Sequence, residues 1–464
     1  MQATTTIKGK WKQFLTVLTP MLITQVGLFA MKFIDTIMAG NAGASDLAGV
    51  AIATSLWLPF YTGIAGILMS ITPIVSQLVG ANRQKEIPST VFQGIYLAVI
   101  IALVILGVGV LVADPVLSLM QLEEEVYRVA KGYLIALAFG IVPLFLYNVL
   151  RYFIDALGQT RISMFIILVA LPFNALFNYV FIFGQWGMPR LGGIGAGVAT
   201  ALTYWFIAAI ALFIVIRWQP FSAFAIFQQR PRISLAHWKE MLTIGVPVGC
   251  AIFFETSIFA VVTLFMSAFD TITIAAHQAA INFASWMYMV PMGIGTALTI
   301  LVGFEVGANR LQDAKQYSIM GIGTAVAFSL LSAVLLWVFR AEAAALYSTE
   351  QAVRTMTQQF LLYAIFFQLS DALVTPIQGV LRGYKDVNWT LFLTLISFWV
   401  FGIPVGILLA NYTAFGPFGY WMGLISGLGV GAIGLWARLI LVQRKYSNQA
   451  GHEQPSTCRS QNVL

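Results

Sequence analysis

The sequence predicts an all-α polytopic membrane protein, with twelve transmembrane helices in two pseudo-symmetric six-helix lobes. Three observations support this prediction: the composition, the spacing of the apolar segments and an internal repeat. Of the 464 residues, 59% are hydrophobic and 9% are charged, whereas a soluble domain carries about 25% charged residues. A chain with so few charges cannot cover a water-exposed surface with them.

Twelve apolar segments are long enough to cross a bilayer, which takes about 20 residues in a helix. The first follows the basic start Met1–Lys12 and is too long for a cleavable signal peptide. The second and eighth contain internal proline and glycine, so we expect them to be tilted, bent or continued as helix beyond the membrane. The predicted spans are residues 13–38, 48–79, 90–113, 128–150, 162–183, 194–217, 241–266, 273–306, 317–339, 356–380, 389–410 and 418–442.

The distribution of Lys and Arg predicts the orientation. With the N-terminus inside, 19 of the 25 basic residues fall on cytoplasmic segments, and the acidic run Glu123-Glu124-Glu125 falls outside. Both termini are therefore expected in the cytoplasm. No basic domain stands apart from the spans, so no nucleic acid is expected as a partner. The two cysteines, Cys250 and Cys458, are too few for a disulfide framework.

A repeat with a constant offset of 227 positions relates the two halves of the chain: Trp11 returns as Trp238, Pro20 as Pro247, and Gly80–Arg83 as Gly307–Arg310. Six spans per half is an even number, so both copies start on the same side and form a parallel repeat. The repeated tetrapeptides are interpreted as helix ends capped by glycine, with direct substrate contact as the alternative. The predicted domains are an N-lobe (1–218, spans 1–6), a cytoplasmic linker (219–236), a C-lobe (237–445, spans 7–12) and a cytoplasmic tail (446–464).

Three acidic residues lie inside predicted spans: Asp35 in the first, Glu255 in the seventh and Asp371 in the tenth. An acid at the centre of a bilayer costs about 3 kcal/mol, so each should face an internal cavity and bind a cation, a proton or a substrate. None is duplicated at the offset of the repeat, so the lobes share a scaffold and differ in chemistry. Lys32 lies one turn before Asp35 on the same helix face. It either pairs with the acid or extends to the outer interface.

Further polar and adaptable side chains extend the candidate site. Gln278 and Asn282 lie one turn apart on the eighth span and Tyr288 follows, so their oxygens could join two carboxylates around a hard monovalent cation. Hydrogen bonding between helices explains Gln278 and Asn282 equally well. Asn174 and Asn178 form a similar pair on the fifth span, where packing and cavity lining are both open. The candidates for an adaptable, drug-binding surface are Phe254, Tyr288 and Met292.

Several motifs together resemble one family. They are Phe33–Gly40, the Pro73–Gly80 segment, Phe253-Phe254-Glu255, His277–Phe283, and Ser370-Asp371 followed by Gly379–Asp386. In register across residues 10–445, they resemble the multidrug and toxic compound extrusion (MATE) transporters, specifically the bacterial NorM branch.

The resemblance implies a MATE-like antiporter in the bacterial cytoplasmic (inner) membrane. Such a protein exports organic, often cationic, drugs by alternating access in exchange for Na⁺ or H⁺. The resemblance also implies that Glu255 and Asp371 form the cation site of the C-lobe and that Asp35 acts in the N-lobe. At two positions the sequence departs from the family. Phe367 stands where relatives often carry Tyr, which removes one oxygen ligand for a metal cation, and Lys32 stands where small or apolar residues are common.

Other functions fit the sequence less well. The chain contains no P-loop, no HExxH motif and no paired His/Cys metal spacing, so we expect no enzyme activity and no cofactor besides the coupling ion. A channel filter is usually built from symmetric subunits. A lipid or oligosaccharide flippase of related fold is the alternative function, and it should show a basic cavity. We expect a monomer whose partners are the lipid bilayer and small organic cations and other drugs.

Overall fold

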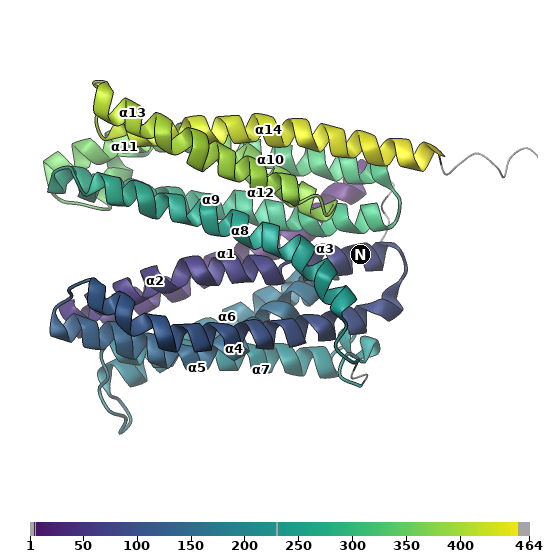
Figure 1. The fold of residues 1–464 in the computed structure, drawn as a ribbon, viewed down its shortest axis with the longest axis horizontal. Helices are drawn as coiled ribbons and strands as arrows, with labels where there is room; N and C mark the ends of the chain where they lie inside the picture. The colour runs from purple at the N-terminus through teal and green to yellow at the C-terminus, as the bar shows by residue number, and fades with distance from the viewer. Residues whose placement is uncertain (1–3, 5, 229–230, 453–464) are drawn as a thin grey trace, which may run out of the picture. The chain divides into compact units, whose positions relative to one another are not determined.

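The computed structural model describes residue 4, residues 6–228 and residues 231–452, and all regular secondary structure in these ranges is helical (Figure 1). The all-α prediction is confirmed. Sequence features that fall outside these ranges are Arg230, Cys458, Arg459 and the end of the predicted tail from residue 453 onward.

Twelve helical spans are long and apolar enough to cross a membrane, which confirms the predicted number. Most extend beyond the predicted limits, because the polar turns of helix at each end carry no hydropathy signal. The helices are α1 (Ile7–Ala42), α2 (Ala44–Leu68), α3 (Ile71–Gly80), α4 (Ile87–Leu119), α5 (Glu124–Ala156), α6 (Thr160–Phe183), α7 (Gly193–Arg217), α8 (Leu235–Met266), α9 (Thr271–Gly307), α10 (Leu311–Ala345), α11 (Gln351–Gly383), α12 (Asn388–Leu395), α13 (Ile403–Tyr412) and α14 (Phe418–His452), with short helices at Gln84–Glu86, Phe221–Phe224 and Ile396–Gly402.

The second and eighth spans, both expected to be irregular or overlong, behave differently. The second is divided into α2 and α3 by a turn at Met69 and Ser70, whereas the eighth is one continuous 37-residue helix, α9. The eleventh span holds an irregularity that the sequence did not predict. A π-helical segment, Ile396–Gly402, joins α12 to α13. Such segments often occur at functional sites because they change the direction of the side chains that follow.

The chain folds into two compact units. The first contains Leu15–Val75 and Arg83–Phe253, and the second contains the described residues of Gln2–Phe14, Ser76–Asn82 and Phe254–Leu464. The boundary between the units therefore falls within α8, after the predicted linker. The physical reason is a close contact of α8 with α2. A Cβ on Gly245 would lie 2.3 Å from the carbonyl oxygen of Ile67, and one on Gly66 would lie 2.7 Å from the Cα of Gly249. The role of residues 219–236 as a cytoplasmic linker stays a prediction.

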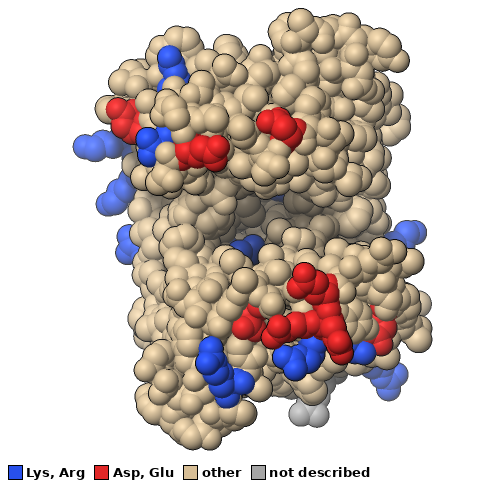
Figure 2. Space-filling model, turned by 90° about the vertical axis from the view of Figure 1, so that its left-hand side faces the viewer, with Lys and Arg blue, Asp and Glu red and all other residues tan. Residues whose placement is uncertain are grey.

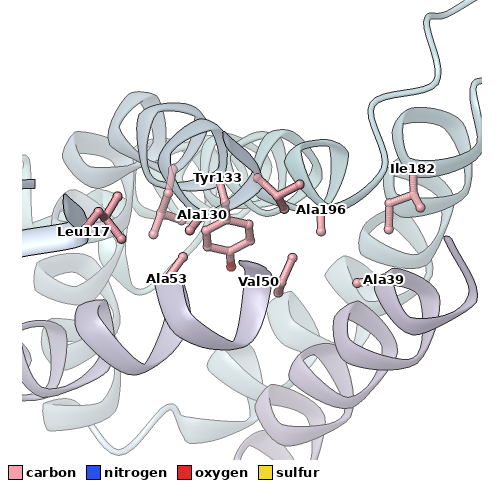
Figure 3. Packing of buried hydrophobic residues seen from close by; sticks show 10 residues of the cluster. Ala39, Val50, Ala53, Leu117, Ala130, Tyr133, Ile182 and Ala196 are labelled. Carbon is pink, nitrogen blue, oxygen red and sulfur yellow. The ribbon is translucent and has the colours of Figure 1, made fainter. Parts of the chain in front are cut away.

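The first unit is held together by an apolar cluster to which all six of its spans contribute. Figure 3 shows the ring of Tyr133, on α5, pointing toward Val50 and Ala53 on α2. A Cβ on Gly197 of α7 would lie 2.8 Å from the Tyr133 carbonyl oxygen, so the absence of a side chain there lets α7 approach α5. Figure 1 shows these two helices side by side.

The repeated tetrapeptides end α3 and α9, as predicted for helix ends. The residue with left-handed backbone is not the glycine, however, but Asn82 (φ 57°) in one copy and Asn309 (φ 58°) in the other. Gly80 and Gly307 instead allow close contact within the second unit. A Cβ on Gly80 would lie 1.9 Å from the carbonyl oxygen of Phe304. Asparagine tolerates the left-handed region, so it can end the helix while glycine serves the packing.

The acidic run Glu123-Glu124-Glu125 lies at the turn between α4 and α5, at the end of the first unit away from the mark N in Figure 1. Figure 2 shows the left-hand side of the view in Figure 1, where both acidic groups, in red, and Lys and Arg, in blue, lie on a mainly uncharged surface.

Candidate functional site

Asp35 on α1 accepts hydrogen bonds from two neighbouring helices of the first unit. Asn178 Nδ2 donates to Oδ1 at 2.5 Å, and Asn174 Nδ2 donates to the same oxygen at 3.2 Å. Thr200 Oγ1, on α7, donates to the other oxygen at 3.3 Å. The two asparagines are one turn apart on α6, so both amides reach the same acid. The structure thus brings three predicted residues together and adds Thr200.

Lys32 takes no part in this hydrogen-bond set. Its side chain is exposed, and among the described residues no salt bridge joins it to Asp35. The oxygens of Asp35 are occupied by uncharged donors instead. Lys32 is still within electrostatic range of Asp35, so pairing with the acid and extension to the outer interface both stay predictions.

The other two acids lie in the second unit. Glu255, on α8, is 8% exposed, and Asp371, on α11, is 3% exposed. Thr375, one turn further along α11, donates to Asp371 Oδ1 at 3.0 Å. The two carboxylates are within electrostatic range of each other, and Tyr288 on α9 is within range of both. The predicted residues Glu255, Asp371 and Tyr288 are therefore neighbours, and Arg382 also lies within range of Glu255.

A pocket lies beside Asp371, between α9, α10 and α11. Its walls are largely apolar, so a charge inside is poorly solvated and interacts strongly with any polar group nearby. The polar groups in the wall come from all three helices. The lining residues are Ala284, Met287, Tyr288, Pro291, Phe328, Ser329, Ser332, Phe367, Gln368 and Asp371.

Other acids buried in the spans are paired with arginine. Asp155 lies 3.5 Å from Arg151 Nε, and Glu305 accepts a hydrogen bond from Arg310 Nε at 2.6 Å. The part of the chain that the structure describes contains no such salt bridge for Asp35, Glu255 or Asp371. The structure thus separates two acids that form salt bridges from three that form none in the described part of the chain, although Arg382 lies within electrostatic range of Glu255 and Lys32 within range of Asp35.

Comparison with protein families identifies the kind of protein that carries this site. The model of the MatE family matches residues 20–180 and 247–408. The chain belongs to the MatE family. The resemblance predicted from the motifs is therefore confirmed. The two matched segments begin 227 positions apart, so the family's unit recurs at the offset of the internal repeat.

Similar MatE proteins match along nearly their whole length. The probable multidrug resistance protein NorM of Halalkalibacterium halodurans is 55% identical over 450 residues, covering 97% of this chain and 98% of that protein. A protein of the same name from Bacillus subtilis (strain 168) is 52% identical over 449 residues, covering 97% and 99%. The names of these relatives describe multidrug resistance proteins, and the family is one of transporters rather than enzymes, as the sequence predicted.

Solved structures of MATE transporters share the fold of this MatE protein. The crystal structure of the eukaryotic MATE transporter AtDTX14 gives a TM-score of 0.84 at 20% identity, over 95% of this chain and 99% of that one. The bent form of the Vibrio cholerae transporter VcmN gives 0.83 at 20% identity, over 95% and 98%. At this identity the likeness establishes the fold alone.

The remaining predicted residues of this MatE protein lie in several environments. Gln278 and Asn282 are exposed on α9, and Asn282 Oδ1 accepts a hydrogen bond from Tyr347 at 3.2 Å. Among the described hydrogen bonds, none links either residue to Glu255 or Asp371. Phe254 is half-buried, with its ring centroid 5.9 Å from that of Trp399 in an edge-to-face contact, and Met292 is also half-buried. Their roles in a site stay predictions.

Several polar residues near the acids were missed at the sequence level. Thr375, Gln378 and Arg382 follow Asp371 by four, seven and eleven positions, so they share its face of α11. This spacing is readable in the sequence and could have found them. Gln368 and Ser329 gave no such signal, because single polar residues in apolar spans are common.

Proposed function

We propose that this MatE protein is a cation-coupled multidrug efflux antiporter, which exports organic, often cationic, compounds by alternating access in exchange for Na⁺ or H⁺. The observation that supports it most is the separation of the acids within the spans into those with and those without a salt bridge. Asp155 and Glu305 form salt bridges with arginine, whereas Asp35, Glu255 and Asp371 form none among the described residues, and Arg382 lies only within electrostatic range of Glu255. An unpaired carboxylate in apolar surroundings is costly unless a cation, a proton or a cationic substrate offsets its charge.

Coupling follows from competition for these carboxylates. A coupling ion and a cationic drug that offset the same negative charge disfavour each other, so binding of the ion from outside promotes release of the drug. Glu255 and Asp371 are proposed to exchange the ion in the second unit, and Asp35 acts in the first. Phe254, Tyr288 and Met292 are proposed to contribute apolar and π surface that accepts differently shaped drugs.

Cellular placement is part of the same proposal. The relatives are bacterial proteins named for multidrug resistance, and the excess of Lys and Arg on one set of loops favours cytoplasmic termini. We therefore place the protein in the bacterial cytoplasmic membrane as a monomer with both termini inside. Twelve spans in an even-numbered parallel repeat are consistent with this orientation.

Ethidium efflux from proteoliposomes tests the proposal. The full chain is reconstituted, the vesicles are loaded with ethidium, and a sodium gradient is imposed while the proton gradient is collapsed, then the reverse. The proposal predicts that at least one of the two gradients drives efflux and that its collapse stops it. Equal ethidium release with and without both gradients would contradict coupled antiport.

The flippase of related fold remains the alternative because two arginines, Arg151 and Arg382, are nearly buried within the spans. A pyrophosphate-linked substrate needs surplus positive charge. Arg151, however, is paired with Asp155, and Arg382 lies within range of Glu255, so each positive charge has an acid nearby. Movement of a fluorescent lipid between leaflets, without ethidium efflux in the same vesicles, would favour the flippase.

A further inference from the structure

A hollow on the surface of the first unit lies between α5 and α7, two helices that run side by side (Figure 1). It holds about 820 Å³ of empty space, counting its open side, which falls within the ~300–1,000 Å³ typical of sites for small organic ligands. We call it the α5–α7 groove. The lining residues are Gly132, Ile135, Ala136 and Phe139 of α5, and Ile194, Val198, Ala201, Leu202 and Trp205 of α7.

Close backbone contact and one hydrogen bond give the groove its shape. A Cβ on Gly132 would lie 2.6 Å from Cδ1 of Ile194, so the absence of a side chain there lets α7 approach α5, as it does at Gly197. Trp205 Nε1 donates a hydrogen bond across the groove to the carbonyl oxygen of Phe139 at 3.0 Å. The side chains of Phe139 and Trp205 remain exposed. The groove therefore follows from how the two helices pack.

The groove lies within membrane-spanning segments, so its occupant comes from the bilayer. Both helices are long and apolar enough to cross a membrane. From Ile194 to Trp205 the helix advances about 17 Å, at ~1.5 Å for each residue. This length is close to half of the ~30 Å hydrocarbon core, which is the depth of one leaflet. An acyl chain of a membrane lipid matches both the length and the apolar lining.

Two charged residues continue the groove's face of α5 toward the start of the helix. Arg128 lies four positions before Gly132 and Glu125 seven positions before it, so the three share one face. Their charged side chains are 72% and 64% exposed, and they approach each other only to 3.8 Å. An exposed pair of this kind contributes about 0.2–1 kcal/mol, so either side chain can take another partner. Lys131 is held instead by Asp114 at 2.8 Å.

We propose that the α5–α7 groove, Arg128 and Glu125 bind one phospholipid with a primary ammonium in its headgroup, phosphatidylethanolamine. An acyl chain fills the groove. Arg128, nearer the groove, donates charge-assisted hydrogen bonds to the phosphate. Glu125, one turn further out, accepts a hydrogen bond from the ammonium, which carries three N–H donors. Groove, cation and acid thus follow one another along α5 in the order of chain, phosphate and ammonium in the lipid.

The headgroup distinguishes this lipid from other phospholipids. Phosphatidylcholine has methyl groups in place of the N–H donors, so it keeps the contact with Arg128 and loses the hydrogen bond to Glu125. Phosphatidylglycerol has no positive charge to offer that carboxylate. A lipid held by its chains alone would show no preference among the three. The inference goes beyond the proposed antiport and does not depend on which ion drives it.

Thermal melting of the purified full chain in detergent tests the inference, with lipids of identical acyl chains titrated in. Phosphatidylethanolamine is expected to raise the melting temperature until the site is saturated, and to bind about tenfold more tightly than phosphatidylcholine or phosphatidylglycerol. Native mass spectrometry should count one retained lipid. Glu125→Gln should remove the preference over phosphatidylcholine, and Arg128→Gln should weaken binding of both lipids about tenfold. Ala136→Phe fills the groove from a half-buried position and should prevent saturable binding of all three.

Arg83→Gln is the matched control. Arg83 and Glu86 are also an exposed pair three positions apart, but they precede α4, no residue of which lines the groove. This variant should bind phosphatidylethanolamine like the wild type. The inference is overturned if the wild type binds the three lipids equally, or if Arg128→Gln and Ala136→Phe both bind phosphatidylethanolamine as the wild type does. A dimer that Ala136→Phe converts to a monomer would also overturn it, because a second copy would then cover the groove. None of these measurements involves transport, so each outcome leaves the proposed antiport standing.

Discussion

The acid of the first unit and the buried acid on α11 of the second are satisfied in opposite ways. Asp35 accepts three hydrogen bonds from uncharged donors, those of Asn174, Asn178 and Thr200. Asp371 accepts one described hydrogen bond and lies beside a pocket that contains unpartnered oxygens. Donors stabilise an ionised carboxylate without any ion, whereas a carboxylate surrounded by further acceptors is satisfied only when a cation joins it. The difference indicates that the two acids have different tasks.

The repeat makes this difference informative. The family model matches both halves of the sequence, at positions 227 residues apart. The scaffold therefore does not dictate the chemistry of either acid. Asp35 obtains its donors from α6 and α7, while Asp371 meets oxygens from α10 and α11. Under our account, the second unit carries the ion-dependent switch, whereas Asp35 is held by hydrogen bonds from uncharged donors.

The largest expected effect comes from removing charge in the second unit. Glu255→Gln and Asp371→Asn preserve size and hydrogen bonding but eliminate the negative charge that a cation needs. Each should reduce gradient-driven ethidium efflux by about a hundredfold or more, while the protein still folds and inserts. Efflux is measured in proteoliposomes containing equal amounts of protein. Asp114→Asn, at an exposed salt bridge with Lys131, is the control and should transport normally.

Wild-type efflux in both Glu255→Gln and Asp371→Asn would show that the candidate site of the second unit is wrong.

A smaller and more selective effect is expected for Asp35. Asp35→Asn should lower efflux about tenfold but change sodium affinity by less than about twofold, because uncharged donors already occupy three of the roughly four acceptor sites of the Asp35 carboxylate. Sodium titration and ethidium efflux on the same preparation measure both quantities. Loss of sodium binding in this variant would erase the distinction between the two acids.

The sequence predicts the scaffold well because its signals are local. Twelve spans follow from apolar length, and the repeat follows from identical residues at one offset. Asn174 and Asn178 were found because two asparagines one turn apart in an apolar span are conspicuous. The helical spacing of Gln278 and Asn282 predicts that both lie on one face of their helix. It does not predict what that face contacts, and in the structure both side chains are exposed. Gln368 and Ser329 could not be found, because the sequence does not reveal that the folded chain leaves their side chains without hydrogen-bond partners among the described residues. The π-helical segment at Ile396–Gly402 likewise has no signature in the hydropathy pattern.

Adding a phenolic oxygen at position 367 should raise the sodium affinity by a modest factor. Phe367→Tyr adds one oxygen at the edge of the pocket, so sodium affinity should rise by about threefold and the dependence of efflux on sodium should increase. The gain is limited because Phe367 is 5% exposed and packed, so the added hydroxyl displaces neighbouring atoms. Sodium titration at fixed pH measures it. If the wild type and Phe367→Tyr bind sodium equally tightly, the phenolic oxygen is not needed as a sodium ligand.

The smallest effect is expected at Lys32. The residue is exposed and forms no salt bridge with Asp35 among the described residues, so Lys32→Ala should change efflux by less than about twofold. In a double-mutant cycle, Lys32→Ala with Asp35→Asn should match Asp35→Asn alone. Efflux rates are measured across pH. A double variant that transports clearly better than Asp35→Asn would reveal a charge pair.

Counterflow of radioactive sodium tests coupling at the second unit most directly. Proteoliposomes loaded with ethidium are placed in buffer containing radioactive sodium, with the proton gradient collapsed, and sodium uptake is recorded as ethidium leaves. The account predicts that sodium enters only while ethidium leaves, and that Asp371→Asn abolishes both fluxes while Asp35→Asn still binds sodium. Ethidium efflux without sodium entry in the wild type, or sodium entry that continues in Asp371→Asn, would contradict it.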